Sequence, residues 1–167
     1  MHSKIKKIVV CALMAALACV ATLIIRIPSP MKGYINLGDG VVLLAGWMLS
    51  PIYGFLAAAV GSALADVFAG YVIYAPVTFL IKGVMALIAA ALLRFVKNGK
   101  GKNLSFLLGG ILAEIFMVLG YFVFEGFLYG FAASALNLVA NFVQATAGLI
   151  VGLILIKVLE RAKIDFK

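Results

Sequence analysis

The sequence predicts an all-α integral membrane protein with six transmembrane helices, and its composition and length support this fold class. The chain has 167 residues, of which 66% are hydrophobic, and its mean hydropathy is +1.22. Soluble domains are closer to half apolar. A helix that crosses a bilayer needs about 20 apolar residues, so six helices use about 120 residues. We therefore expect one transmembrane domain over residues 1–167 and no separate soluble domain.

Six apolar segments can be placed along the chain. The first follows the basic residues Lys4, Lys6 and Lys7 and is longer than the core of a signal peptide. The second is short and ends at a Ser-Pro turn, and the fourth begins at Pro76, a residue favoured in the first turn of a helix. We predict helices over residues 5–27, 39–49, 52–70, 76–96, 104–124 and 132–159.

Lysine and arginine are unevenly distributed among the predicted loops. Cytoplasmic loops carry an excess of both residues. With six spans and both termini cytoplasmic, basic residues gather on the cytoplasmic side, and only Arg26 and Lys32 lie on the opposite side. We therefore predict a multi-pass protein of the cell membrane, and the net charge of +8 needs no nucleic acid partner to explain it.

The stretch 34–83 places charged and amide side chains in an otherwise apolar run. Such groups are costly at membrane depth and usually face a bundle interior or a water-filled cavity. Further polar residues follow in the last two spans, and those at 137, 141 and 144 share one helix face. We expect a small-molecule pocket, open to the outside and covered by the loop 28–38. The predicted lining is Asn36, Asp39, Tyr74, Thr78, Lys82, Glu114, Tyr121, Asn137, Asn141 and Gln144.

Each of these residues also has a purely structural interpretation. Asp66 and Lys82 are predicted at similar depth on neighbouring helices, so they are expected to form a buried ion pair, touch the ligand, or do both. Glu114 serves the ligand or is a neutral, protonated carboxyl group. The amides of the last span line the pocket or join helices. Most tyrosines, including Tyr34 and Tyr71, are assigned to the aromatic belt at the membrane interface.

Three sequence segments carry a resemblance to a known family. They are YINLGDGVVLLAG, GFLAAAVGSALADVFAGY and YAPVTFLIKG. Together with the size and the predicted topology, the resemblance extends over nearly the whole chain. The sequence resembles the substrate-binding S component of an energy-coupling-factor (ECF) vitamin transporter, of the hydroxymethylpyrimidine, pyridoxine or riboflavin type. The Ala12-x-x-x-Ala16 pattern is similar to the motif by which S components dock on the transmembrane T component.

The resemblance implies a mechanism of uptake. The protein would bind a vitamin from outside, associate with the T component and two ATPase subunits, and release the vitamin inside after ATP-driven toppling. The sequence has no GxxxxGK[ST] phosphate-binding loop, so ATP hydrolysis would come from the partners. We expect a non-catalytic subunit without cofactor, and no metal or haem spacing is present.

Three other classes compete with this interpretation. An intramembrane aspartyl protease would pair Asp39 with Asp66, but Asn36 stands where a GxGD motif has its first glycine. A self-sufficient secondary transporter commonly shows inverted repeats, and the sequence shows no convincing repeat. A structural subunit has no need of so many inward polar groups.

The nature of the predicted lining favours a flat heterocycle with hydroxyl groups or ring nitrogens. Pyridoxine or hydroxymethylpyrimidine suits a chain this small, and riboflavin is the alternative. Folate, with two carboxylates, would require more positive charge than Lys82 supplies.

The predicted topology can be tested by chemical labelling. Single cysteines that replace Lys32 and Lys100 should react with an impermeant thiol reagent from opposite sides of the membrane, because these residues lie in loops on opposite sides. Intact cells and inverted vesicles provide the two measurements. Labelling of both positions in intact cells would contradict six spans.

Overall fold

The computed structural model describes residues 2–29, 33–95 and 100–163, and this part of the chain forms six helices and one short hairpin. The strands β1 (Ile27–Pro28) and β2 (Tyr34–Ile35) pair antiparallel, with Ile27 opposite Ile35. The helices are α1 (His2–Ile24), α2 (Gly38–Met48), α3 (Pro51–Ala69), α4 (Ala75–Phe95), α5 (Lys100–Tyr129) and α6 (Phe131–Arg161).

Helix α2 occupies the centre of the bundle. It packs against α1, α3, α4 and α6, and all eleven of its residues are buried. Its sequence GDGVVLLAGWM is apolar on every side after the first turn, which is the pattern of a helix surrounded by protein. The position of α2 matters for the site, because Asp39 in its first turn is carried into the bundle interior.

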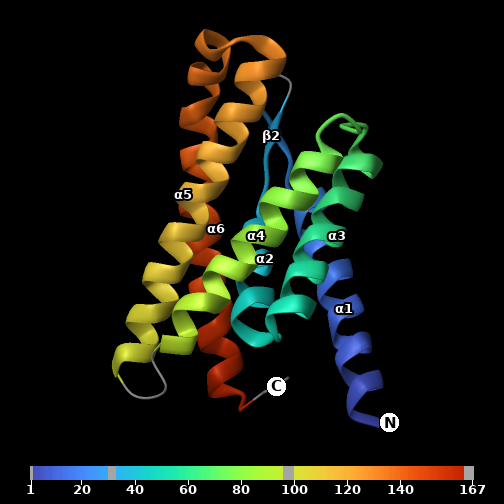
Figure 1. Cartoon of the computed structure of the whole chain (residues 1–167), viewed down its shortest axis with the longest axis vertical. Coiled ribbons are helices and arrows are strands. Elements are labelled where there is room, and N and C mark those ends of the chain that lie inside the picture. The colour runs from blue at the N-terminus through green and yellow to red at the C-terminus, as the bar shows by residue number, and fades with distance from the viewer. Residues whose placement is uncertain (1, 30–32, 96–99, 164–167) are drawn as a thin grey trace.

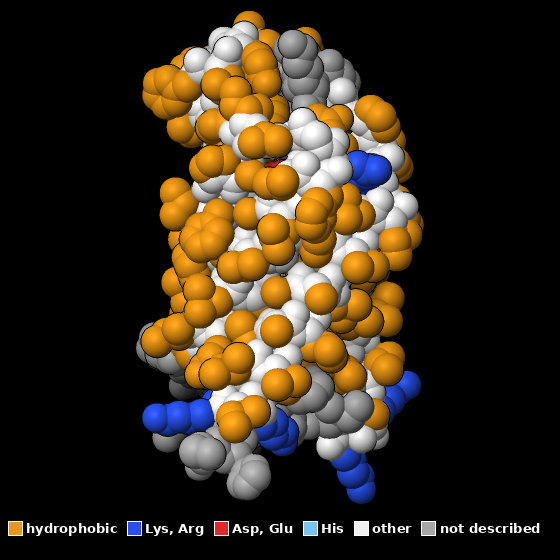
Figure 2. All heavy atoms as spheres, turned by 90° about the vertical axis from the view of Figure 1, so that its right-hand side faces the viewer, with side chains coloured by type: hydrophobic (Ala, Val, Ile, Leu, Met, Phe, Trp, Pro, Cys, Tyr) orange, Lys and Arg blue, Asp and Glu red, His pale blue; other side chains and the backbone are white. Residues whose placement is uncertain are grey.

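The hairpin and the turn between α5 and α6 lie at one end of the molecule, which we call the hairpin end (Figure 1). The start of α1 and the end of α6 lie at the opposite end, the terminal end (Figure 1). Figure 2 shows a face covered by hydrophobic side chains over most of its height, with lysine and arginine side chains mainly at the terminal end. An apolar outer surface with basic residues at one end is typical of a helical membrane protein.

Five of the helices are long and apolar enough to cross a membrane, and α2 is shorter. Each predicted span corresponds to one helix, so the all-helical membrane architecture is confirmed. The number of crossings and their orientation stay predictions. The eleven residues of α2 rise by about 16 Å, roughly half the thickness of the hydrocarbon core, and non-helical residues precede them. Non-helical backbone is tolerated at that depth when protein surrounds it.

Several predicted boundaries were wrong, and the fifth helix, for example, begins at Lys100 and not at residue 104. The segment 125–131 is not a loop, because α5 continues to Tyr129 and α6 begins at Phe131. The turn is made at Gly130, whose φ of 90° is readily adopted only by glycine. The first helix ends at Ile24, because residues 27 and 28 pair with β2.

Small residues let the helices approach closely. Five small residues of α3 are buried, namely Gly54, Ala57, Ala58, Gly61 and Ala65. A methyl group added at Gly61 would overlap the carbonyl oxygen of Ala15 on α1, and one added at Gly46 would overlap that of Ala86 on α4. Close backbone contact of this kind is a main source of attraction between helices in lipid.

Gly46→Ala should therefore destabilise the bundle by about 1–3 kcal/mol, because the central helix must move away from α4. Unfolding of the purified protein in detergent measures the effect. Gly109→Ala is the matched control, since its new methyl group would lie 3.3 Å from the nearest atom, the carbonyl oxygen of Ala89. An equal loss in both variants would contradict the close contact between α2 and α4.

Candidate functional site

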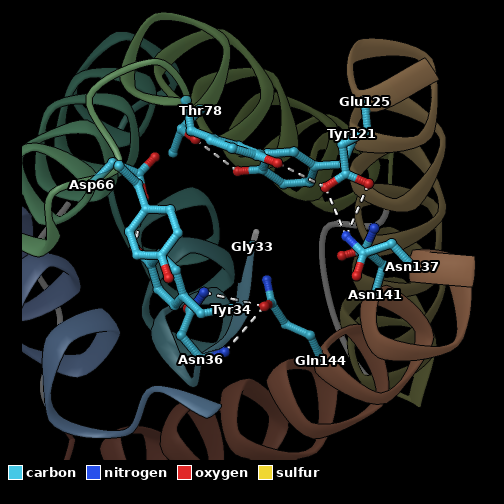
Figure 3. Close-up of a pocket in the computed structure, with 12 residues that line it drawn as sticks. Gly33, Tyr34, Asn36, Asp66, Thr78, Tyr121, Glu125, Asn137, Asn141 and Gln144 are labelled. Carbon is cyan, nitrogen blue, oxygen red and sulfur yellow. Dashed lines mark hydrogen bonds between the residues drawn. The ribbon is translucent and has the colours of Figure 1, made fainter. Parts of the chain in front are cut away.

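A pocket lies near the hairpin end, between the hairpin and the helices α3 to α6 (Figure 3). Its volume is about 370 Å³ with the space at its open mouth included. Its lining is polar and aromatic rather than aliphatic. The lining residues are Gly33, Tyr34, Asn36, Asp66, Tyr71, Tyr74, Thr78, Tyr121, Glu125, Asn137, Asn141 and Gln144.

The pocket brings together most of the residues that the sequence predicted for the site. They come from the residue after β2, from α4, α5 and α6, and from the turn between α3 and α4. Those that line the pocket are Asn36, Tyr74, Thr78, Tyr121, Asn137, Asn141 and Gln144. Their contact with a ligand stays a prediction.

Four tyrosines form a continuous aromatic wall. The ring centroids of Tyr34 and Tyr71 lie 4.9 Å apart, those of Tyr71 and Tyr74 lie 6.2 Å apart, and those of Tyr74 and Tyr121 lie 6.5 Å apart. The assignment of Tyr34 and Tyr71 to the interfacial belt was therefore wrong, because both rings face the pocket. The strand β2 and the turn after α3 bring these residues inward, which sequence spacing alone does not reveal.

Hydrogen bonds fix two of the tyrosine hydroxyls. The hydroxyl groups of Thr78 and Tyr121 lie 2.9 Å apart across α4 and α5. Tyr34 donates to Asp66 Oδ1 at 2.6 Å.

A carboxylate on α5 that was not predicted from the sequence also lines the pocket. Glu125 Oε1 and Oε2 accept from Asn137 Nδ2 at 2.7 and 2.9 Å, and Tyr74 donates to Oε1 at 3.4 Å. Figure 3 shows Glu125 and Asn137 facing each other across α5 and α6. The residue was assigned to a loop. It lies eleven residues after Glu114 and four after Tyr121, which places it on the same helix face, and this periodicity was the signal that could have identified it.

The floor of the pocket is a chain of hydrogen bonds between α6, the segment before α2, and α2 itself. Gln144 Oε1 accepts from the backbone and side-chain nitrogens of Asn36, both at 3.1 Å. Gln144 Nε2 donates to Asp39 Oδ2 at 2.8 Å, and Lys82 donates to Asp39 Oδ1. Asn36 Oδ1 in turn accepts from the backbone nitrogen of Gly38 at 2.9 Å.

This geometry corrects the expected ion pair. Lys82 is paired with Asp39, whereas Asp66 is bonded to Tyr34. The physical reason is that the buried helix α2 packs against α4 and brings Asp39 to Lys82, while Asp66 near the end of α3 is closer to the hairpin. The two aspartates therefore have different partners, which does not suit a catalytic pair.

Three predicted lining residues lie outside the pocket wall. Asp39, Lys82 and Glu114 are all buried but do not line the pocket. Both carboxylate oxygens of Glu114 lack a hydrogen-bond partner among the described residues. Gly148 leaves room for both this carboxyl group and Asp39, because a methyl group there would lie 2.5 Å from Asp39 Cβ and 2.9 Å from Glu114 Oε1. These three residues form a second layer near the floor.

Several polar atoms in the pocket wall are free to meet a ligand. Asp66 Oδ2, Asn137 Oδ1 and Asn141 Nδ2 are buried and have no hydrogen-bond partner among the described residues. Buried polar atoms are nearly always bonded in native proteins. The wall therefore offers acceptors and donors to a bound molecule. No group of three metal-ligating side chains occurs in the described part of the chain.

The helix face proposed for docking is accessible. Ala12 and Ala16 are exposed on α1, whereas Met14 and Ala18 on the same helix are buried at 5% and 1% exposure. These two alanines therefore do not pack inside the bundle. Partner docking through them stays a prediction.

The fold and the pocket define a helical membrane protein that holds a small molecule near one end of its bundle. Residues 2–161 match the model of the family described as ECF-type riboflavin transporter, S component, and the chain belongs to this family. It is therefore a membrane-embedded, non-catalytic substrate-binding subunit of vitamin uptake. Subunits of this family work with a T component and ATPase subunits in the membrane.

The chain is also similar to two other proteins. An uncharacterized protein of Pyrococcus woesei, encoded in the gap 3′ region, is 38% identical over 134 residues, which cover 80% of this chain and 87% of the relative. A solved structure of the S component of a bacterial ECF transporter has the same fold. Its TM-score is 0.76 with 24% sequence identity, over 95% of this chain and 97% of that chain.

Proposed function

We propose that this protein binds a neutral, flat heterocyclic vitamin from the outside of the cell and delivers it to a T component and two ATPase subunits for ATP-driven uptake. The observation that carries the proposal is the pocket, with its aromatic wall and its unbonded polar atoms at one end of an apolar bundle. Pockets for small molecules combine apolar surface with a few polar groups that fix orientation.

The charges of the wall support a neutral ligand. Asp66 and Glu125 are carboxylates, and the described lining residues include no Lys, Arg or His. The ammonium group of Lys82 lies in the second layer and is neutralised by Asp39. A phosphorylated or dicarboxylate ligand would be repelled by such a wall, because like charges are costly at low dielectric. The wall suits hydroxyl groups, ring N–H groups, carbonyls and ring nitrogens.

We propose riboflavin as the first ligand to test. Its isoalloxazine ring can stack on the tyrosine wall, because flat aromatic rings attract one another in offset or tilted contact. Its ring carbonyls and nitrogens can accept hydrogen bonds from amides, and the hydroxyls of its side chain can donate to Asp66 and Glu125. The family match to riboflavin-type S components agrees with this choice.

Pyridoxine or hydroxymethylpyrimidine is the second candidate. A single heterocycle with hydroxymethyl groups offers the same kinds of donor and acceptor to the wall. Competition between the three vitamins at one binding site separates the candidates.

Purified protein should bind riboflavin and quench its fluorescence, and flavin mononucleotide should bind more weakly because its phosphate meets an acidic wall. Asn141→Ala should weaken binding about ten-fold, as expected for the loss of one buried hydrogen bond. Asn103→Ala is the matched control, because Asn103 lies at the terminal end and is bonded to Lys157. Equal affinity of wild type and Asn141→Ala would show that the ligand binds elsewhere.

Ala16→Leu should separate binding from transport. The residue is exposed, so a leucine there should leave folding and vitamin binding unchanged but hinder the close approach of a partner helix. Uptake is measured in cells with and without the T component and ATPase subunits. Ala18→Leu is the contrasting variant, because Ala18 is buried and its enlargement should impair binding and uptake together. Full uptake without the partners would refute this mechanism.

A further inference from the structure

The orientation of an amide group decides which hydrogen-bonding groups the pocket floor presents. A glutamine or asparagine side chain can turn either its oxygen or its nitrogen toward a partner. Gln144 lies between Asp39 on one side and Asn36 on the other. If one of these partners can only accept hydrogen bonds, or can only donate them, that partner decides how the Gln144 amide is turned.

Asp39 is that partner. Lys82 carries only donors, and its ammonium group is bonded to Asp39 Oδ1 at a site where the two side chains are 3% and 0% exposed. An isolated charge at this depth would be very costly, so Asp39 and Lys82 stabilise each other as an ion pair. An ionised carboxylate can only accept, and Gln144 must therefore turn Nε2 toward Oδ2, at 2.8 Å.

The same constraint passes to Asn36. Since Gln144 Nε2 faces Asp39, its Oε1 faces Asn36 and accepts two hydrogen bonds from it. Asn36 Oδ1 accepts from the Gly38 backbone nitrogen, so both amide oxygens of the floor are engaged. The amide nitrogens of Gln144 and Asn36 each use one N–H group in these hydrogen bonds, to Asp39 and to Gln144 respectively. Each nitrogen has a second N–H group that can donate to a ligand. In Figure 3 the amide nitrogen of Gln144 points toward the middle of the pocket.

We propose that the buried Asp39–Lys82 ion pair determines ligand specificity by fixing the amides of Gln144 and Asn36, so that the pocket floor offers N–H donors and selects a ligand whose facing edge carries hydrogen-bond acceptors. The opposite part of the wall, with Asp66 and Glu125, offers acceptors. A ligand with carbonyls or ring nitrogens at one edge and hydroxyl groups at the other fits this polarity. The inference rests on the proposed vitamin binding and adds the orientation of the ligand.

Gln144 is the only glutamine in the sequence, so it can be observed directly. Protein labelled with ¹⁵N in the glutamine side chain should give one pair of amide proton signals in detergent micelles. One proton, bonded to Asp39, should lie downfield and exchange slowly with solvent, and the other should not. Addition of riboflavin should shift the second signal. Two signals that exchange equally fast in the ligand-free protein would overturn the inference.

The double variant Asp39→Leu/Lys82→Met supplies the second measurement. Replacing a buried ion pair by apolar residues of similar size is often tolerated, whereas a single substitution would leave a lone buried charge. We expect the double variant to fold, to lose the downfield amide signal, and to bind riboflavin at least ten-fold more weakly. Unchanged riboflavin affinity in the folded variant would overturn the inference.

Glu160→Ala is the matched control, because it removes ion pairs to Lys102 and Lys157 at the terminal end, away from the pocket. It should leave both the Gln144 signals and the riboflavin affinity unchanged. If wild-type protein fails to bind riboflavin, the proposed ligand is wrong. The signals of the ligand-free protein then decide the inference on their own: a slowly exchanging downfield proton that disappears in the double variant supports it, and its absence from the wild type overturns it.

Discussion

The ion pair between Asp39 and Lys82 lies at the start of the helix around which the others pack, and both side chains are almost fully buried. Two separate charges at this depth would each be costly, so their pairing is a condition for α2 and α4 to share the interior. The pair also uses the N-terminal end of α2, where a negative side chain is favoured by the helix dipole. Through Asp39 this constraint extends to Gln144 and Asn36 and so to the floor of the pocket.

Close packing of small residues supports this arrangement. Gly46 allows the backbone of α2 to touch α4, and Gly148 leaves room on α6 for Asp39 and Glu114 to approach each other. Larger side chains at either position would push α2 away from α4 or α6 and change the hydrogen bonds of the floor. The pocket therefore depends on how the helices pack. Close backbone contacts at glycine residues set the positions of the helices that carry the polar wall.

The same packing places the pocket and the exposed small-residue face of α1 in different regions of the molecule. Polar side chains gather near the hairpin end, where the strand β2 enters the bundle against α6. The exposed small-residue face of α1 and the basic residues of the terminal end lie outside this region. Ligand recognition and partner docking can thus use different surfaces, which is what a substrate-binding subunit of a multi-component transporter needs.

The sequence by itself determined the membrane class, the approximate position of six helices and most of the amides and aromatic residues of the pocket, because hydropathy and helical spacing are local properties. Only the tertiary structure decided that Lys82 pairs with Asp39 rather than Asp66, because two residues at similar predicted depth differ only in which helices touch. It also decided that Glu125, Tyr34 and Tyr71 face the pocket. Their inward direction depends on a one-residue turn at Gly130 and on a short hairpin, whose geometry arises from contacts between distant parts of the chain.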